Sequence, residues 1–89
     1  MDIESVWRNI RIHEGEEFHT VSGLPFTYAV VGNILVPSRT NYSLGKSEVE
    51  KVMSMMPVKG PGSISRLVRG SSYLFALLTD SRIAGTAER

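Results

Sequence analysis

The sequence contains no cysteine, no long apolar run and almost no net charge. Without cysteine, neither disulfide bonds nor thiolate zinc sites can reinforce a small core, so packing must stabilise it. No apolar run approaches the ~20 residues that cross a bilayer, and we expect no membrane partner. The first twelve residues mix acidic and basic side chains, unlike a secretion signal, so a cytoplasmic location is expected.

The chain of 89 residues has the length of one domain. Such a short domain buries only about 60% of the surface that its unfolded chain exposes, which argues against a large internal active-site cavity. The apolar fraction of 42% and the charged fraction of 21% are those of an ordinary globular protein. We predict a single domain over residues 1–83 and a flexible tail over residues 84–89, which have little apolar content to bury.

Apolar spacing predicts a helix followed by three strands. From residue 3 to residue 10 an apolar side chain recurs every three or four positions, which favours a helix that ends before Gly15. Aromatic and β-branched residues then gather in three stretches separated by turn-forming residues. The stretches 18–21, 26–31 and 34–36 predict a three-stranded antiparallel meander.

The second half of the chain is predicted to be mainly helical. A turn-rich stretch comes first, in which a short edge strand near Tyr42 stays open as an alternative. Ser47 and Glu50 have the spacing of a capping box and predict the start of a helix. The predicted helical stretches are 47–56, 64–68 and 73–81. The expected fold class is therefore α+β: an N-terminal helix, a three-stranded antiparallel meander, and two or three short helices packed on the sheet.

Charge is distributed unevenly along the chain. Residues 1–37 carry two arginines against five acidic side chains, whereas residues 38–71 carry six lysines and arginines against two acidic side chains. The basic middle of the chain suits a phosphate-bearing partner better than the net charge of +1 suggests.

Two glycine- and serine-rich turns, residues 59–63 and 69–72, each adjoin a basic residue and precede a predicted helix. Unpaired N–H groups at a helix start can hold a phosphate; the alternative is that the serines only cap helices. The spacing does not fit a P-loop, so nucleotide hydrolysis is not predicted. The predicted phosphate- or nucleic-acid-binding residues are Arg39, Lys46, Lys59, Gly60, Gly62, Ser63, Arg66, Arg69, Gly70, Ser71 and Ser72, with Tyr42 for base stacking.

Residues 63–82 invite comparison with a helix-turn-helix, and the match is poor. If Gly70 were the turn glycine, Arg66 would occupy a position where close packing of the two helices requires a small residue. A major-groove reader is therefore not the leading interpretation, and contacts to phosphates with little base reading are expected instead.

A protein-interaction module is the alternative from a different class. Met55 lies off the apolar stripe of its predicted helix, and the segment with Tyr73 and Phe75 is apolar on more than one face. Such surfaces suit a small adaptor or inhibitor that docks on a larger protein, or a homodimer. A phosphorylated small molecule or free nucleotide held at a dimer interface is a further alternative.

The two histidines lie among acidic residues, and these residue types can ligate a metal or move protons. If His19 lies in a strand, Glu16 and Glu17 point to opposite faces, so no metal site and no cofactor are predicted, and a solvated acidic turn is favoured over a site that includes His13. No serine, threonine or tyrosine stands beside a histidine or lysine in a spacing that activates a nucleophile. The predicted function is therefore non-catalytic binding of a phosphate-bearing ligand, nucleic acid first.

Overall fold

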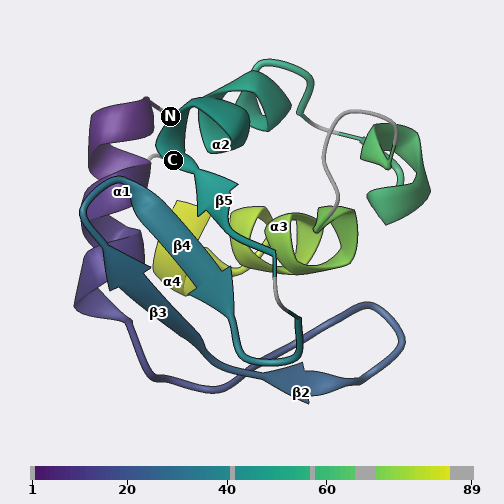
Figure 1. Cartoon of the computed structure of the whole chain (residues 1–89). Helices are drawn as coiled ribbons and strands as arrows, with labels where there is room; N and C mark the ends of the chain where they lie inside the picture. The colour runs from purple at the N-terminus through teal and green to yellow at the C-terminus, as the bar shows by residue number, and fades with distance from the viewer. Residues whose placement is uncertain (1, 41, 57, 66–69, 85–89) are drawn as a thin grey trace.

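The computed structural model describes residues 2–40, 42–56, 58–65 and 70–84. It confirms the α+β class, with an N-terminal helix, a three-stranded antiparallel sheet and short helices after it (Figure 1). None of the helices in these ranges is both long and apolar enough to cross a membrane. The elements are α1 (Ile3–Ile12), β1 (Phe18–His19), β2 (Pro25–Phe26), β3 (Tyr28–Val31), β4 (Ile34–Pro37), β5 (Leu44–Gly45), α2 (Lys46–Met53), the 3-10 helix η1 (Pro61–Ile64), α3 (Ser71–Leu78) and α4 (Ser81–Ala84).

The three-stranded sheet has the order β3-β4-β5, so the predicted meander was wrong in its first strand. Residues 18–21 supply only β1, which pairs with β2 in a separate two-stranded sheet. The outer edge of β3 is already occupied, because the Gly15 N–H donates to the Tyr28 carbonyl and the Val30 N–H donates to the Glu14 carboxylate. A third strand is instead added on the other side of β4 by β5, close to the edge strand left open near Tyr42.

The predicted hairpin turn after β3 is confirmed. Val31 pairs with Ile34 across the two-residue connection, and Gly32 has a positive φ of 60°. Primed hairpin turns require positive φ, which glycine adopts without steric cost. This turn places Asn33 next to the start of α2, where its carbonyl accepts the Lys46 N–H at 2.8 Å.

The helices of the second half begin earlier than predicted. α2 starts at Lys46 and ends at Met53, and the carboxylate that reaches back to its N-terminus belongs to Glu48, which accepts the Gly45 N–H at 2.8 Å. The predicted Ser47–Glu50 capping box was therefore wrong by two residues. α3 covers residues 71–78 rather than 73–81, and Ala84, predicted to begin the tail, is the last residue of α4.

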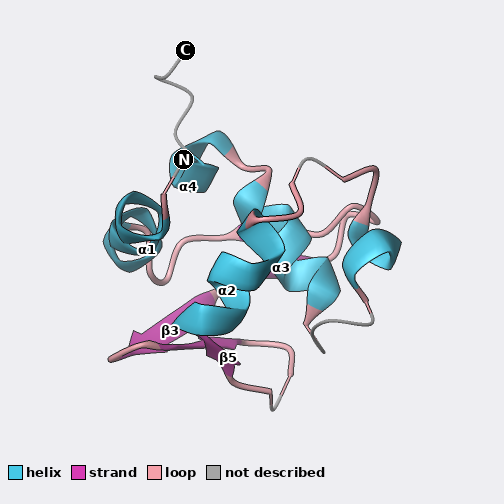
Figure 2. Cartoon of the chain, turned by 90° about the horizontal axis from the view of Figure 1, so that it is seen from above, coloured by secondary structure: helices cyan, strands magenta, loops and turns pink. Residues whose placement is uncertain are grey.

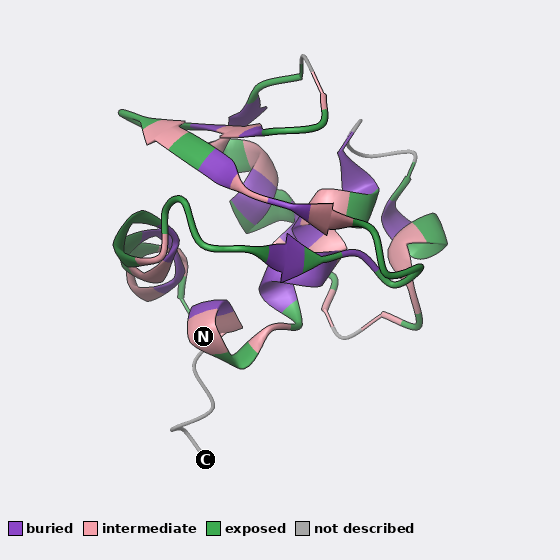
Figure 3. Ribbon diagram, turned by 90° about the horizontal axis from the view of Figure 1, so that it is seen from below, coloured by how far each residue is buried: buried purple, intermediate pink, exposed green. Residues whose placement is uncertain are grey.

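The helices lie on one face of the β3-β4-β5 sheet, with α3 central (Figure 2). Leu74, Leu77 and Leu78 of α3 are each at most 2% exposed, and Figure 3 shows this helix buried along most of its length. The nearly all-round apolar pattern of this segment is thus explained by its place inside the domain.

The opposite face of the sheet is apolar and carries no covering element in the described ranges (Figure 2). Strand alternation turns Tyr28 and Leu35 inward, and it turns Ala29, Val31 and Ile34 outward. Val31 is 70% exposed and Ile34 is 39% exposed.

Candidate functional site

A basic hollow lies between α1 and the start of α2. Its volume is about 220 Å³, and it is lined by Glu4, Trp7, Arg8, Arg11 and Lys46. Arg8 and Arg11 share one face of α1 because helix positions three apart are neighbours. Lys46 is the first residue of α2, which packs beside α1.

The fold of α1 fixes which side chains reach this hollow. Asp2 caps the helix, and its Oδ1 accepts the Ser5 N–H at 2.9 Å. That backbone hydrogen bond, with a second bond from the Ser5 hydroxyl, lowers the pKa of Asp2 and keeps the cap charged. Burial of Val6 and Ile10 against the core turns the opposite face, with both arginines, to solvent.

The hollow is electropositive. It contains three cationic side chains and one carboxylate, and that carboxylate, Glu4, is 3.1 Å from the Lys46 ammonium. Among the described residues no carboxylate lies within ion-pair distance of Arg8 or Arg11. Unpaired guanidinium groups beside a concave surface can bind an oxyanion through paired N–H donors.

Trp7 connects the hollow to the core. Its side chain is only 2% exposed, and its buried Nε1 has no hydrogen-bond partner in the described part of the chain. It is also the sole tryptophan of the sequence. A ligand in the hollow therefore lies beside the chain's strongest intrinsic fluorophore.

The predicted basic residues that the structure describes do not gather at one place. Of these, only Lys46 lines the basic hollow. Arg39 lies in the turn after β4, where its Nε donates to the Pro25 carbonyl, and Lys59 is exposed just before η1. Figure 1 shows the β4-β5 connection and η1 on other sides of the fold from α1. Arg66 and Arg69 lie outside the described residues.

The two glycine- and serine-rich turns have structural roles where they are described. Gly60 precedes the four-residue η1, and its carbonyl accepts the Ser63 N–H at 3.1 Å. Gly62 and Ser72 are exposed, whereas Gly70 and Ser71 are buried. A Cβ at Gly70 would come within 2.9 Å of the Leu44 side chain, so packing accounts for this glycine. Phosphate binding by these turns stays a prediction.

The residues predicted for a protein interface, and Tyr42 predicted for base stacking, differ in exposure. Met55 is 44% exposed, as predicted from its position off the apolar stripe. Tyr73 and Phe75 are half-buried and pack against the core, and the Tyr73 ring meets Phe26 edge-on with centroids 4.9 Å apart. Tyr42 is 38% exposed in the connection before β5.

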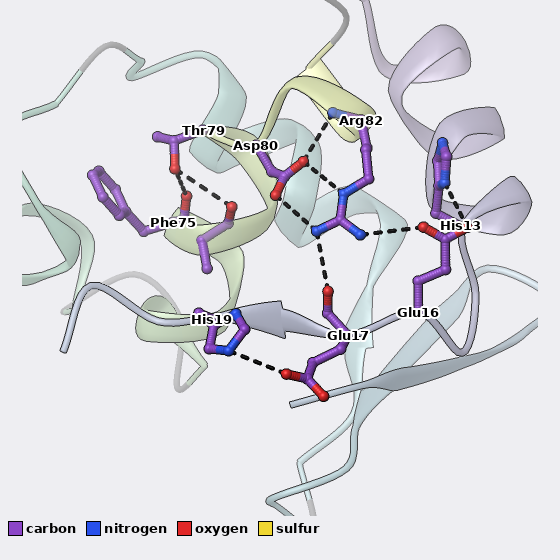
Figure 4. Close-up of polar contacts among 9 residues, drawn as sticks. His13, Glu16, Glu17, His19, Phe75, Thr79, Asp80 and Arg82 are labelled. Atoms are coloured by element: carbon purple, nitrogen blue, oxygen red, sulfur yellow. Dashed lines mark hydrogen bonds and ion pairs between the residues drawn. The ribbon is translucent and has the colours of Figure 1, made fainter. Parts of the chain in front are cut away.

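A second polar cluster centres on Arg82 of α4 (Figure 4). Its Nε and Nη2 donate to the two oxygens of Asp80 at 3.0 Å each, and Nη1 donates to Glu16 at 3.2 Å. Nη2 also donates to the Glu17 carbonyl at 3.1 Å, and the guanidinium lies 3.7 Å from the centre of the Phe18 ring. This arginine fastens α4 to the segment that joins α1 and β1.

The Arg82 cluster holds its acidic members ionised. The hydrogen bonds from Arg82 lower the pKa of Asp80, and those with Asp80 in turn raise the pKa of Arg82. A hydrogen bond with His13, followed by the one from Arg82, lowers the pKa of Glu16. Every nitrogen of the guanidinium is already paired, so this cluster offers an incoming anion little.

The histidines form separate contacts. His13 Nδ1 lies 2.9 Å from Glu16 Oε2, and His19 Nε2 lies 3.1 Å from Glu17 Oε2. Within the described ranges no three histidine, aspartate or glutamate side chains are grouped in a way that could hold a metal ion.

Sequence reasoning missed Arg8 and Arg11 because it counted charge along the chain, which placed them in an acidic segment. A helical projection of residues 3–12 could have found them, since positions 4, 8 and 11 fall on one face.

The chain was also compared with known proteins. No family model, no curated protein and no solved structure matches it.

Proposed function

We propose that this protein is a non-catalytic binding protein for a phosphate-bearing ligand, with nucleic acid as the first candidate. The observation that carries the proposal is the gathering of Arg8, Arg11 and Lys46 around one hollow to which the described residues contribute a single carboxylate. Phosphate contacts by lysine and arginine supply most of the sequence-independent affinity for nucleic acid.

The geometry of α1 suits contact with phosphate groups. Arg8 and Arg11 are one helical turn apart and exposed, so they can contact neighbouring phosphates or two oxygens of one phosphate. Lys46 approaches from a different element, and a bound phosphate competes with Glu4 for its ammonium group.

The test compares two variants of equal net charge. Arg8→Ala/Arg11→Ala removes two cations from the hollow, and Lys51→Glu changes the net charge by the same amount at an exposed position outside it. Binding of labelled single-stranded DNA, RNA and duplex DNA is measured by fluorescence anisotropy at low and near-physiological salt. We expect at least a tenfold loss for the first variant and little change for the second. An equal loss in both variants, or binding that salt does not weaken, overturns the proposal.

A second candidate function is association with a second copy of this chain. The outward face of β3 and β4, with Val31 and Ile34, carries no charged residue, so an equally uncharged copy of itself is complementary to it. Edge pairing along β3 is blocked by Glu14 and Gly15, which leaves face-to-face packing. Sedimentation of the wild type and Val31→Glu tests this: a dimer that the variant dissociates supports it, and a wild type that stays monomeric at high concentration refutes it.

A further inference from the structure

The basic hollow has a neighbour of different chemistry. A second hollow of about 560 Å³ is lined by Ile3, Asn33, Ile34, Gly45, Ser47 and Glu50, and it shares Glu4 and Lys46 with the basic hollow. Because Glu4 and Lys46 line both hollows, their ion pair stands where the two adjoin.

The second hollow is apolar with a polar rim. Ile3 is half-buried and Ile34 is 39% exposed, so together they offer aliphatic surface to a ligand. Asn33 and Ser47 are exposed and supply neutral hydrogen-bonding groups. The Glu50 carboxylate disfavours a phosphate on this side, whereas Arg8 and Arg11 favour one in the first hollow.

A ligand that fits both hollows has a phosphate joined to an uncharged group with an apolar face and hydrogen-bonding atoms at its edge. We propose that the two hollows together bind one nucleotide of a single strand, with its phosphate between Arg8, Arg11 and Lys46 and its base against Ile3 and Ile34. This inference rests on the proposed function and specifies its ligand. A paired base is stacked inside a duplex, where its face cannot reach the isoleucines, so a single strand is required.

The choice of variants follows from the hairpin. Ile34 lines the second hollow, and Val31, its partner directly across the two strands, does not. Both side chains are exposed, so Ile34→Ser and Val31→Ser each remove a surface apolar group at the same hairpin tip. Only the first change removes contact surface for a base.

The experiment measures binding of the full chain to a short thymidine strand, a strand of equal length with abasic sites, the matching duplex, and thymidine monophosphate. We expect the wild type and Val31→Ser to bind the thymidine strand about tenfold more tightly than the abasic strand, because a base that packs against the two isoleucines removes apolar surface from water. Ile34→Ser reduces this preference severalfold and leaves binding to the abasic strand unchanged.

Four results overturn the inference in distinguishable ways. Equal wild-type affinity for the thymidine and abasic strands means that phosphates alone are read, and the proposed function survives. A duplex bound as tightly as the strand removes the requirement for an unpaired base. A monophosphate bound as tightly as the strand assigns the site to a free nucleotide. Absence of binding to every ligand at low salt overturns the proposed function itself.

Discussion

Arg82 and the pair Arg8 and Arg11 are the same residue type in opposite situations. Arg82 contacts two carboxylates and a backbone carbonyl (Figure 4), and it also lies over the Phe18 ring. Arg8 and Arg11 lie on the outer face of α1 with no carboxylate of the described residues within ion-pair distance. An arginine whose three nitrogens all donate to neighbouring groups holds two segments of chain together, and an arginine with free donors beside a hollow is suited to an external anion.

The largest expected effect on stability is at Arg82. Arg82→Ala removes hydrogen bonds to Asp80, Glu16 and the Glu17 carbonyl, so we expect the free energy of unfolding to fall by about 2 kcal/mol. Arg8→Ala should change it by no more than about 0.5 kcal/mol, because an exposed side chain without partners is removed. Urea unfolding followed by circular dichroism measures both. An equal loss of unfolding free energy in the two variants would contradict the view that Arg82 stabilises the fold and Arg8 does not.

Gly70 and Gly62 differ in the same way, because Gly70 is packed against a neighbour and Gly62 is not. Gly70→Ala places a methyl group 2.9 Å from a buried Leu44 atom, so we expect a loss of about 1 kcal/mol in stability. Gly62→Ala meets no atom within 4 Å and should be neutral or slightly stabilising, because alanine restricts the unfolded chain. Thermal unfolding of the two variants checks the pair, and a neutral Gly70→Ala would show that packing does not require this glycine.

Acid should weaken the Arg82 cluster. The pKa values of Asp80 and Glu16 are lowered from their ordinary 3.8 and 4.5, so the unfolded chain binds more protons than the folded chain in this range. The stability they contribute is complete above about pH 4.5 and is lost as pH falls through their depressed folded values. Between about pH 5 and pH 3, the free energy of unfolding should therefore fall more steeply with decreasing pH for the wild type than for Arg82→Ala. An equal pH dependence in the two proteins would contradict a stabilising role of Arg82 through these carboxylates.

The fold class was predictable because local patterns carry it. Apolar spacing defined α1, and the Gly32–Asn33 pair defined the β3-β4 hairpin. The third strand was not predictable, since it depends on Glu14 and Gly15 occupying the outer edge of β3, a contact between distant parts of the chain. Short strands of two residues such as β5 carry too few side chains for a pattern.

The candidate site was predictable only in part. Lys46 was identified from the basic middle of the chain, but its neighbours come from α1, which the sequence places in an acidic segment. The Arg82 cluster was missed for a related reason, because it joins residues 16–18 to residues 80–82. A count of charge along the sequence combines side chains that the fold places on different faces of the molecule, so it does not show where charge of one sign gathers.

The most direct test of the account is the salt dependence of single-strand binding. Binding is monitored through the fluorescence of Trp7, which lines the hollow. Each phosphate contact on a single strand contributes about 0.7 to the slope of log affinity against log salt concentration. We predict that Arg8→Ala/Arg11→Ala reduces the wild-type slope by about 1.4, corresponding to two lost contacts, and that Lys51→Glu leaves it nearly unchanged. A slope unaltered by loss of the two arginines would contradict the claim that this hollow binds phosphate.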